Sequence, residues 1–464
     1  MAQVKERPKP FLVSDYCKGC GRCVSVCVKG CIAFADEINP KTGVIPVVLD
    51  LSKCTACGLC MEACPEPYGL MPREEGVDYE LQDPAKLFGE KHSEAPVPVE
   101  VPGEKVALPA TQPMVIKGNY ASAIGAILAG CRHVFGYPIT PSTEGAELMA
   151  KLMPKLNGIF LQAVSEVATV NHMYGTGGAG LPTMTFTSSP GFSLMLEGVS
   201  YMVGAELPSV FVNVMRGGPG LGNIAPEQAD VKLACHGLGH GHTHCISLMP
   251  STPQEMLDLT MLAFELTFKY RNPVLILADG YLGQMTGKVQ LPTEMIKPGI
   301  PTWAAYGDRN HRRNVISSIQ LLESDLEKFN QYLEKKYQSM EVEARSESFL
   351  ADDAEVLLVA CNTPARAAKG AVQNLRDMGI KAGLFRPITI WPFPTKQLLA
   401  HLPHTKRIVM VEANIGGQIE NELRLALNLA GVEKLPAITH VRRSGGMLPQ
   451  QADIVEHVKS ILGK

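Results

Sequence analysis

The sequence has little charge of either sign and no long hydrophobic run. Charged residues make up 19% of the 464 residues and the formal net charge is −3, which gives no electrostatic reason to bind nucleic acid or an anionic membrane surface. No stretch reaches the ~18 uncharged apolar residues that a membrane-spanning helix needs, and the opening MAQVKERPKPF lacks the apolar core of a secretory signal. These absences predict a cytoplasmic protein with no membrane span and no nucleic-acid partner.

Cysteine is scarce over most of the chain and concentrated near its start. Nine of the thirteen cysteines precede residue 65, and the other four are scattered singly. Because no export signal is present, a framework of disulfides is not expected. The clustered thiols are therefore candidate metal ligands, and zinc remains possible for any pair with C-x2-C spacing.

The spacing of these cysteines favours iron–sulfur clusters over zinc. The pattern C-x2-C-x2-C-x3-C occurs twice, 37 residues apart, and in such doubled runs the fourth cysteine of each run ligates the cluster held by the other run. The predicted ligand sets for two [4Fe–4S] clusters are Cys17, Cys20, Cys23 and Cys64 for the first, and Cys54, Cys57, Cys60 and Cys27 for the second. A degenerate site or zinc is the alternative. Residues 11–70 thus resemble a two-cluster bacterial ferredoxin, although Val28 replaces the usual proline. Cys31 fits neither run and is interpreted as a small buried hydrophobe rather than a spare ligand.

The remainder of the chain alternates patterns of strands and helices, which predicts α/β domains with mostly parallel sheets. Hydrophobic residues at 45% indicate packed cores, and the length suits roughly three domains. The predicted boundaries are a small α+β ferredoxin domain at 1–70, an extended linker rich in Pro and Glu at 71–113, an α/β domain at 114–290, a helical connector at 291–350 and a smaller α/β domain at 351–464.

The glycine run GTGGAG at 175–180 matches G-x-G-x-x-G, but a helical pattern precedes it and a strand pattern follows it. A dinucleotide fingerprint requires the reverse order. The run is therefore interpreted as a helix end with close backbone packing, and nicotinamide binding is rejected.

The connector contains a predicted amphipathic helix. Ser324 and Glu327 have the spacing of a capping box. Leu326, Phe329, Leu333 and Met340 recur on one face. This pattern predicts a docking helix with no chemistry of its own.

Three polar residues of the 114–290 domain are candidate site residues. Thr140 lies at a strand-to-helix junction in GYPITPSTE, where it either caps the helix or offers a hydroxyl to an anion. Glu166 lies on a helix of small and apolar residues, so it is either a solvated exception or a functional acid. Arg216 ends the apolar strand SVFVNV before a glycine-rich loop, a position suited to recognition of a carboxylate or to a structural salt bridge.

Several stretches together resemble the alpha subunit of the 2-oxoacid:ferredoxin oxidoreductases. They are GYPITPSTE, VSEVAT, MRGGPGLGNIAPEQAD, KYRNPVLILADGYLGQM, RPITIWPFP and VEANIGGQIENEL. The resemblance covers residues 114–464 and is closest to the branched-chain (2-oxoisovalerate) type. The ferredoxin segment would correspond to the small iron–sulfur subunit of that family, fused at the N-terminus.

The resemblance implies a division of labour. The domain at 114–290 would be a pyrimidine-type thiamine-diphosphate-binding domain, and the last domain a transketolase C-terminal-like unit. Glu166 would bond the aminopyrimidine of the cofactor, Thr140 would hold the substrate, and Arg216 would pair with the substrate carboxylate. The 2-oxoacid would lose CO2, the acyl group would pass to coenzyme A, and electrons would flow through the clusters to ferredoxin or another low-potential acceptor.

One half of a thiamine site is missing from the sequence. The metal–diphosphate motif, GDG followed by paired asparagines, does not occur, and the nearest string, ADGYLGQM, lacks the asparagines. A beta subunit is therefore expected to supply the Mg²⁺–diphosphate half and a further [4Fe–4S] cluster, and a gamma subunit is also expected.

The loop ACHGLGHGHTHC departs from the family pattern. Its histidines, His236, His240, His242 and His244, could form a metal site by spacing, but a loop near a subunit interface or the substrate pocket is preferred. The departure keeps an arylglyoxylate open as the substrate in place of a branched-chain 2-oxoacid.

Two other functions are alternatives to the redox enzyme. The first is a catalytically inactive electron-transfer or assembly module, against which the joint presence of Thr140, Glu166 and Arg216 argues. The second is a thiamine-dependent decarboxylase without a redox step, against which the eight spaced cysteines argue.

Overall fold

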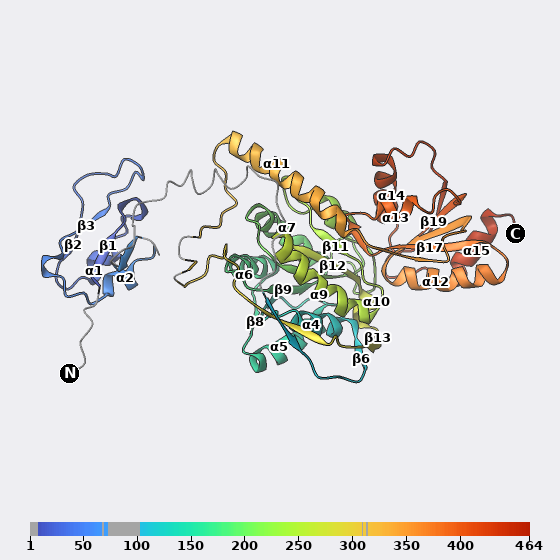
Figure 1. Cartoon of the computed structure of the whole chain (residues 1–464), viewed down its shortest axis with the longest axis horizontal. Helices are drawn as coiled ribbons and strands as arrows, with labels where there is room; N and C mark the ends of the chain where they lie inside the picture. Colours follow the sequence, from blue (N-terminus) through green and yellow to red (C-terminus); the bar gives the residue numbers. More distant parts are fainter. Residues whose placement is uncertain (1–7, 67–68, 73–102, 309, 312–313) are drawn as a thin grey trace. The chain divides into compact units, whose positions relative to one another are not determined.

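The computed structural model describes residues 8–66, 69–72, 103–308, 310–311 and 314–464. The chain divides into two units, Met1–Glu90 and Lys91–Lys464, and Figure 1 labels many of their helices and strands. Within these described ranges, no helix combines the length and apolar character that crossing a membrane would require.

The first unit is built from two similar halves. Its elements are β1 (Pro10–Leu12), η1 (Ser14–Tyr16), α1 (Arg22–Val26), β2 (Ile32–Phe34), β3 (Val47–Leu49), η2 (Leu51–Lys53), α2 (Leu59–Ala63) and β4 (Leu70–Pro72). β1 pairs antiparallel with β4, and β2 pairs antiparallel with β3. Each helix begins after a glycine with positive φ, Gly21 at 71° and Gly58 at 86°, a conformation that glycine adopts without steric cost. The same turn therefore precedes the third cysteine of each run.

The larger unit contains a seven-stranded sheet in the order β18-β11-β12-β10-β9-β7-β8. Its strands are β7 (His133–Gly136), β8 (Ile159–Gln162), β9 (Thr183–Thr187), β10 (Val210–Met215), β11 (Ile246–Leu248), β12 (Val274–Asp279) and β18 (Thr389–Trp391). All neighbouring pairs are parallel except β11 with β18. Every residue of β9, β10 and β12 is buried, as expected for central parallel strands covered on both faces.

Helices cover this sheet and follow its strands. They are α4 (Gly118–Leu128), α5 (Thr143–Leu152), η3 (Met153–Leu156), α6 (Glu166–Gly178), α7 (Ser189–Gly204), α8 (Val231–His236), α9 (Pro253–Tyr270) and α10 (Gly280–Gln284). α4 packs against α9, and α6 packs against α7. The strands and helices predicted for this part of the chain are confirmed, with ends that differ by a few residues.

A second sheet follows in the order β15-β17-β16-β19-β20. The elements of this part are η4 (Glu341–Glu343), β15 (Ser346–Phe349), β16 (Val356–Ala360), α12 (Asn362–Asp377), β17 (Ala382–Pro387), α13 (Thr395–Leu399), β19 (Arg407–Glu412), α14 (Gln418–Leu429), β20 (Ala437–Arg442) and α15 (Gln451–Ile461). Strand β18, which follows β17 in the chain, joins the seven-stranded sheet instead. Because β17 belongs to one sheet and β18 to the other, two consecutive strands of the chain link the two sheets.

Part of the predicted linker at 71–113 is a strand. β5 (Gly103–Ala107) pairs antiparallel with β14 (Glu294–Pro298), and β6 (Met114–Lys117) pairs with β13 (Thr286–Val289). Residues 73–102 of that linker lie outside the described residues.

The glycine run at 175–180 lies in the last turns of α6 and just beyond it. A Cβ at Gly177 would lie 2.7 Å from the carbonyl oxygen of Pro208, and Gly180 has a φ of +71°. The interpretation of a helix end with close backbone packing is confirmed.

The connector helix is α11 (Glu323–Met340). Phe329, Leu333 and Met340 are buried as predicted, but Leu326 is 44% exposed. The predicted capping box is wrong, because the helix begins before Ser324 and its N-cap residue, Leu322, makes no side-chain capping bond.

Candidate functional site

The three candidate residues of the large sheet lie at one edge of it. Thr140 follows β7, Glu166 opens α6 after β8, and Arg216 directly follows β10. These strands belong to the contiguous parallel set β10-β9-β7-β8. Because parallel strands end at the same edge, and open α/β sheets bind ligands there, the fold gathers residues that are 76 positions apart in sequence, such as Thr140 and Arg216.

Arg216 joins two loops at this edge. Its guanidinium donates from Nη1 to the carbonyl oxygen of Thr140 at 2.8 Å and from Nη2 to the carbonyl oxygen of Leu221 at 3.1 Å. The side chain is 6% exposed, and its Nε is buried without a hydrogen-bond partner. Among the described residues Arg216 has no carboxylate within salt-bridge distance, so the structure shows a buried cation with donor capacity left over rather than a structural salt bridge.

Thr140 and Glu166 differ in exposure. Thr140 is exposed, and the N-cap of the following α5 is Ser142, so Thr140 does not cap that helix. Glu166 is 6% exposed and is the first residue of α6, after the N-cap Ser165 whose Oγ accepts a hydrogen bond from the Ala168 N–H at 3.1 Å. A negative charge at that position is stabilised by the helix dipole. The same edge of the sheet therefore carries a buried carboxylate, Glu166, and a buried guanidinium, Arg216.

Two further residues of this edge, Thr187 and Ser188, were not predicted from the sequence. Thr187 ends β9, the strand between β10 and β7, and Ser188 follows it. Both side chains are fully buried, and neither hydroxyl has a hydrogen-bond partner among the described residues. A Cβ at Gly191 would lie 2.5 Å from Thr187 Oγ1 and 2.6 Å from Glu166 Oε1. A run of hydroxyl residues at the end of a buried strand is the sequence pattern that could have indicated them.

The glycine-rich loop that carries Arg216 is anchored to the second sheet region. Asn223 Nδ2 donates to the carbonyl oxygen of Gly445 at 3.0 Å, and Gln228 Nε2 donates to that of Cys361 at 3.1 Å. At its base, Asp230 accepts hydrogen bonds from Ser189 Oγ at 2.6 Å and from Asn213, and burial raises the pKa of Asp230. These contacts hold the Arg216 backbone in place.

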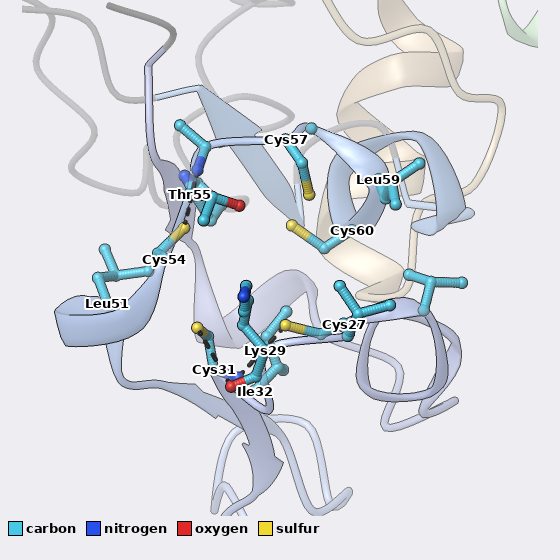
Figure 2. Close-up of a pocket in the computed structure, with 15 residues that line it drawn as sticks. Cys27, Lys29, Cys31, Ile32, Leu51, Cys54, Thr55, Cys57, Leu59 and Cys60 are labelled. Atoms are coloured by element: carbon cyan, nitrogen blue, oxygen red, sulfur yellow. Dashed lines mark hydrogen bonds between the residues drawn. The ribbon is translucent and has the colours of Figure 1, made fainter.

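The eight cysteines of the two runs line two hollows in the first unit. One is lined by Cys17, Cys20, Cys23 and Cys64, and the other by Cys27, Cys54, Cys57 and Cys60. Figure 2 shows the sulfur atoms of the second set around their hollow. The fourth cysteine of each run thus lies with the first three of the other run, the arrangement on which the predicted ligand sets depend.

Cys31 also lines the second hollow (Figure 2). Its side chain is 4% exposed, and its backbone N–H donates to Cys27 Sγ at 3.3 Å. Burial raises the pKa of the Cys31 thiol. Across the described part of the chain, no three His, Cys, Asp or Glu side chains converge as ligands of a single metal ion.

The four histidines at positions 236–244, at the end of α8 and in the loop after it, do not form one group of metal ligands. His236 Nε2 lies 2.7 Å from Glu422 Oε1, and His242 Nε2 lies 2.8 Å from Glu334 Oε2. His244 stacks on Trp391 with ring centroids 4.7 Å apart, and burial lowers its pKa to about 4. His240 is exposed. His236, His242 and His244 therefore anchor this segment to α14, α11 and β18, and His242 and His244 both pack against Tyr337 of α11.

Family models cover most of the chain. The model described as pyruvate flavodoxin/ferredoxin oxidoreductase, thiamine diphosphate-binding, matches residues 124–351. The pyruvate:ferredoxin oxidoreductase core domain II matches residues 354–454, and a 4Fe-4S dicluster domain matches residues 16–67.

Individual relatives agree with these models. The ketoisovalerate oxidoreductase subunit VorB of Methanothermobacter thermautotrophicus is 44% identical over 351 residues, which cover 75% of this chain and 98% of the relative. The 2-oxoglutarate synthase subunit KorA of Archaeoglobus fulgidus is 35% identical over 67% of this chain and 90% of its own. The solved 2-oxoglutarate:ferredoxin oxidoreductase from Magnetococcus marinus, with 2-oxoglutarate, coenzyme A and succinyl-CoA bound, superposes with a TM-score of 0.68 at 27% identity, covering 75% of this chain and 65% of that one. The chain belongs to the 2-oxoacid:ferredoxin oxidoreductase family, as an alpha-type subunit with a 4Fe-4S dicluster domain ahead of its thiamine-diphosphate-binding domain.

Proposed function

We propose that this chain oxidatively decarboxylates a branched-chain 2-oxoacid to an acyl-CoA and CO2, together with partner subunits, and passes the electrons through its clusters to ferredoxin or another low-potential acceptor. The observation that supports this most directly is that Thr140, Glu166 and Arg216 all lie along one edge of the sheet, with Arg216 paired with no carboxylate among the described residues. The 44% identity to a ketoisovalerate oxidoreductase subunit favours the branched-chain substrate.

Arg216 is proposed to bind the substrate carboxylate. Its Nη atoms each hold one backbone carbonyl, while Nε has no partner. A guanidinium in a buried setting forms strong charge-assisted bonds with a carboxylate. The exposed Thr140, whose carbonyl oxygen accepts a hydrogen bond from Arg216, would contact the keto group of the same substrate. Together these two residues would orient the bond that breaks.

Glu166 is proposed to bond the aminopyrimidine ring of thiamine diphosphate. The fit rests on a buried carboxylate that borders the same small space as the buried hydroxyl of Thr187, which has no partner among the described residues, and these groups are complementary to the polar edge of that ring. Bound thiamine diphosphate would supply the carbon nucleophile and the electron sink for decarboxylation. Glu166 itself would hold a proton at the ring nitrogen. Because the chain lacks a diphosphate motif, a beta subunit is proposed to supply the Mg²⁺–diphosphate half of the site.

Each cysteine hollow is proposed to hold one [4Fe–4S] cluster. The donor set fits, because four thiols line each hollow and four cysteine thiolates are the usual ligands of such a cluster. The clusters would supply one-electron carriers for the electrons released from the substrate. Cys31 is the fifth thiol of the second hollow and is proposed not to be a ligand.

The proposal is tested on the complex purified without oxygen from its native source. The co-purifying subunits are identified, and a panel of 2-oxoacids is assayed with coenzyme A and a viologen dye. We expect 2-oxoisovalerate to reduce the dye fastest and only with coenzyme A present. Faster reduction with an arylglyoxylate would overturn the branched-chain assignment, and dye reduction by no 2-oxoacid would overturn the proposed enzyme.

A further inference from the structure

Thr187 has a buried hydroxyl that the described structure leaves without a partner. The residue ends β9 between the strands that lead to Thr140 and Arg216. Its side chain is fully buried, and Oγ1 makes no hydrogen bond with the described residues. Burial of an unpaired hydroxyl costs free energy, so a hydrogen-bond partner within reach of a side-chain rotation is expected for Thr187.

Gly191 shows which group that partner is. It lies in the first turn of α7, a helix in which alanine would normally be the better helix former. A Cβ there would lie 2.5 Å from Thr187 Oγ1 and 2.6 Å from Glu166 Oε1, closer than real Cβ atoms approach such neighbours. The hydroxyl and the carboxylate thus border one small space that a glycine leaves open.

The neighbouring hydroxyls do not serve this purpose. Ser189 Oγ already donates to Asp230 Oδ2 at 2.6 Å. Ser188 is the N-cap residue of α7 without a capping bond, and no contact places it against Glu166. Thr187 is therefore the member of this hydroxyl series that faces the carboxylate.

We propose that Thr187 is a positioning residue that donates a hydrogen bond from its hydroxyl to Glu166 Oε1 and thereby turns the other carboxylate oxygen toward the cofactor ring. This inference rests on the proposed role of Glu166. A hydroxyl bound to a charged carboxylate forms one of the stronger hydrogen bonds in proteins. It fixes the carboxylate while leaving its charge intact, and the space at Gly191 allows the two groups to meet.

The test uses Thr187→Val, which keeps the shape and removes the hydroxyl, and Thr187→Ser, which restores it. Thr183→Val is the matched control, because Thr183 lies on the same face of β9 at its other end, is 1% exposed and also has an unpartnered hydroxyl. Each variant is purified with its partner subunits. Two quantities are measured without substrate: exchange of the thiazolium proton by NMR, and the dissociation constant of thiamine diphosphate by calorimetry.

We expect Thr187→Val to slow proton exchange about 10- to 100-fold and to weaken thiamine diphosphate binding about 10-fold, as for the loss of a hydrogen bond to a charged group. Thr187→Ser and Thr183→Val should stay within about threefold of wild type on both measures, a difference smaller than one such bond. Gly191→Ala, which fills the shared space, should slow exchange as Thr187→Val does.

The outcomes separate this inference from the function on which it rests. If Thr187→Val exchanges the proton at the wild-type rate while Glu166→Gln does not, the role of Thr187 is overturned and the proposed function stands. Equal slowing in Thr187→Val and Thr183→Val would show a packing effect and would also overturn it. Wild-type exchange in Glu166→Gln would instead overturn the proposed role of Glu166, on which this inference rests.

Discussion

At the scale of single residues, the guanidinium of Arg216 has two tasks that mutation can separate. It ties Thr140 to Leu221 through backbone carbonyls, and it offers a buried positive charge. Lysine keeps the charge but lacks the planar fork that reaches both carbonyls. A comparison of alanine and lysine variants therefore distinguishes loop positioning from substrate charge recognition.

Arg216→Ala should weaken use of the 2-oxoacid mainly through KM. We expect kcat/KM to fall by the ~2–4 kcal/mol typical of a charge-assisted pair whose remaining partner is left unpaired. Arg216→Lys should recover part of this loss if the charge is what matters. Steady-state kinetics of the assembled complex measure both variants, and a change in kcat alone would contradict a role in substrate binding.

Glu166→Gln should abolish exchange of the thiazolium proton in the assembled complex before any substrate is added. The amide keeps the shape of the side chain but loses the charge that supports proton transfer on the cofactor ring. Proton NMR with bound thiamine diphosphate measures the exchange directly. The wild-type rate in this variant would mean that Glu166 is only a buried acid at the start of a helix.

At the scale of structural elements, the loop from His236 to Cys245 depends on aromatic packing. His244 stacks on Trp391 of β18 and meets Tyr337 of α11 edge-on, with ring centroids 5.1 Å apart. Tyr337 in turn donates its hydroxyl hydrogen to the carbonyl oxygen of His242 at 2.7 Å. The loop therefore links α11 to the strand that joins the two sheets.

Acid should loosen this loop through His244. Burial lowers its pKa to about 4, whereas the unfolded chain protonates histidine near its ordinary pKa of about 6.5. The neutral folded form is thus stable above pH ~6.5, and its contribution is lost as the pH falls toward 4. We expect a loss of about 1–3 kcal/mol from this residue.

His244→Phe keeps the stacking and removes the titration, so its free energy of unfolding should depend less on pH between ~6.5 and ~4 than that of wild type. Chemical denaturation over this range measures the difference. His240→Gln, at an exposed histidine of the same loop, should follow wild type. Parallel curves for His244→Phe and wild type would show that His244 does not carry the acid sensitivity.

The two cysteine hollows lead to a prediction about metal content. The chain prepared without oxygen should contain about eight irons and eight labile sulfides, four of each per cluster. Cys27→Ala should damage the cluster of the second hollow, whereas Cys31→Ala should leave the iron content unchanged. Iron and sulfide analysis with EPR of the reduced protein measures both. Stoichiometric zinc in place of iron, or equal losses in the two variants, would show that the ligand sets are wrong.

At the scale of the whole molecule, the thiamine site is incomplete within this chain. The proposed residues at the carboxyl edge would bind one end of the cofactor, and the sequence holds no motif for the metal and diphosphate at the other end. On the proposed function, catalysis would require contact with a partner subunit, even though both sheets of this chain are formed without one.

The isolated chain should show no saturable binding of thiamine diphosphate by calorimetry. Without the diphosphate contacts, the ring contacts alone leave too little binding energy to offset the entropy of immobilising the cofactor. Addition of the beta subunit should create the site. Micromolar binding by the chain alone would refute the shared site.

The amino-acid sequence by itself was sufficient for the cluster chemistry and for most elements of the α/β fold. Ligand type and spacing are local properties, so the runs from Cys17 and from Cys54 predict a dicluster domain without any tertiary information. The short apolar run that forms a buried strand such as β12 is also a local pattern.

Other features were decided only by the tertiary structure, because contacts between distant segments depend on strand order, which no local pattern encodes. The order β10-β9-β7 placed Thr187 at the edge with Arg216 and Thr140, and packing left Leu326 exposed on a helix face predicted to be buried. The partners of His236, His242 and His244 likewise come from distant elements, namely α14, α11 and β18. The residue types of this protein therefore determine which chemistry is available to it. The place proposed for the thiamine site, in contrast, follows from the strand order of its sheet.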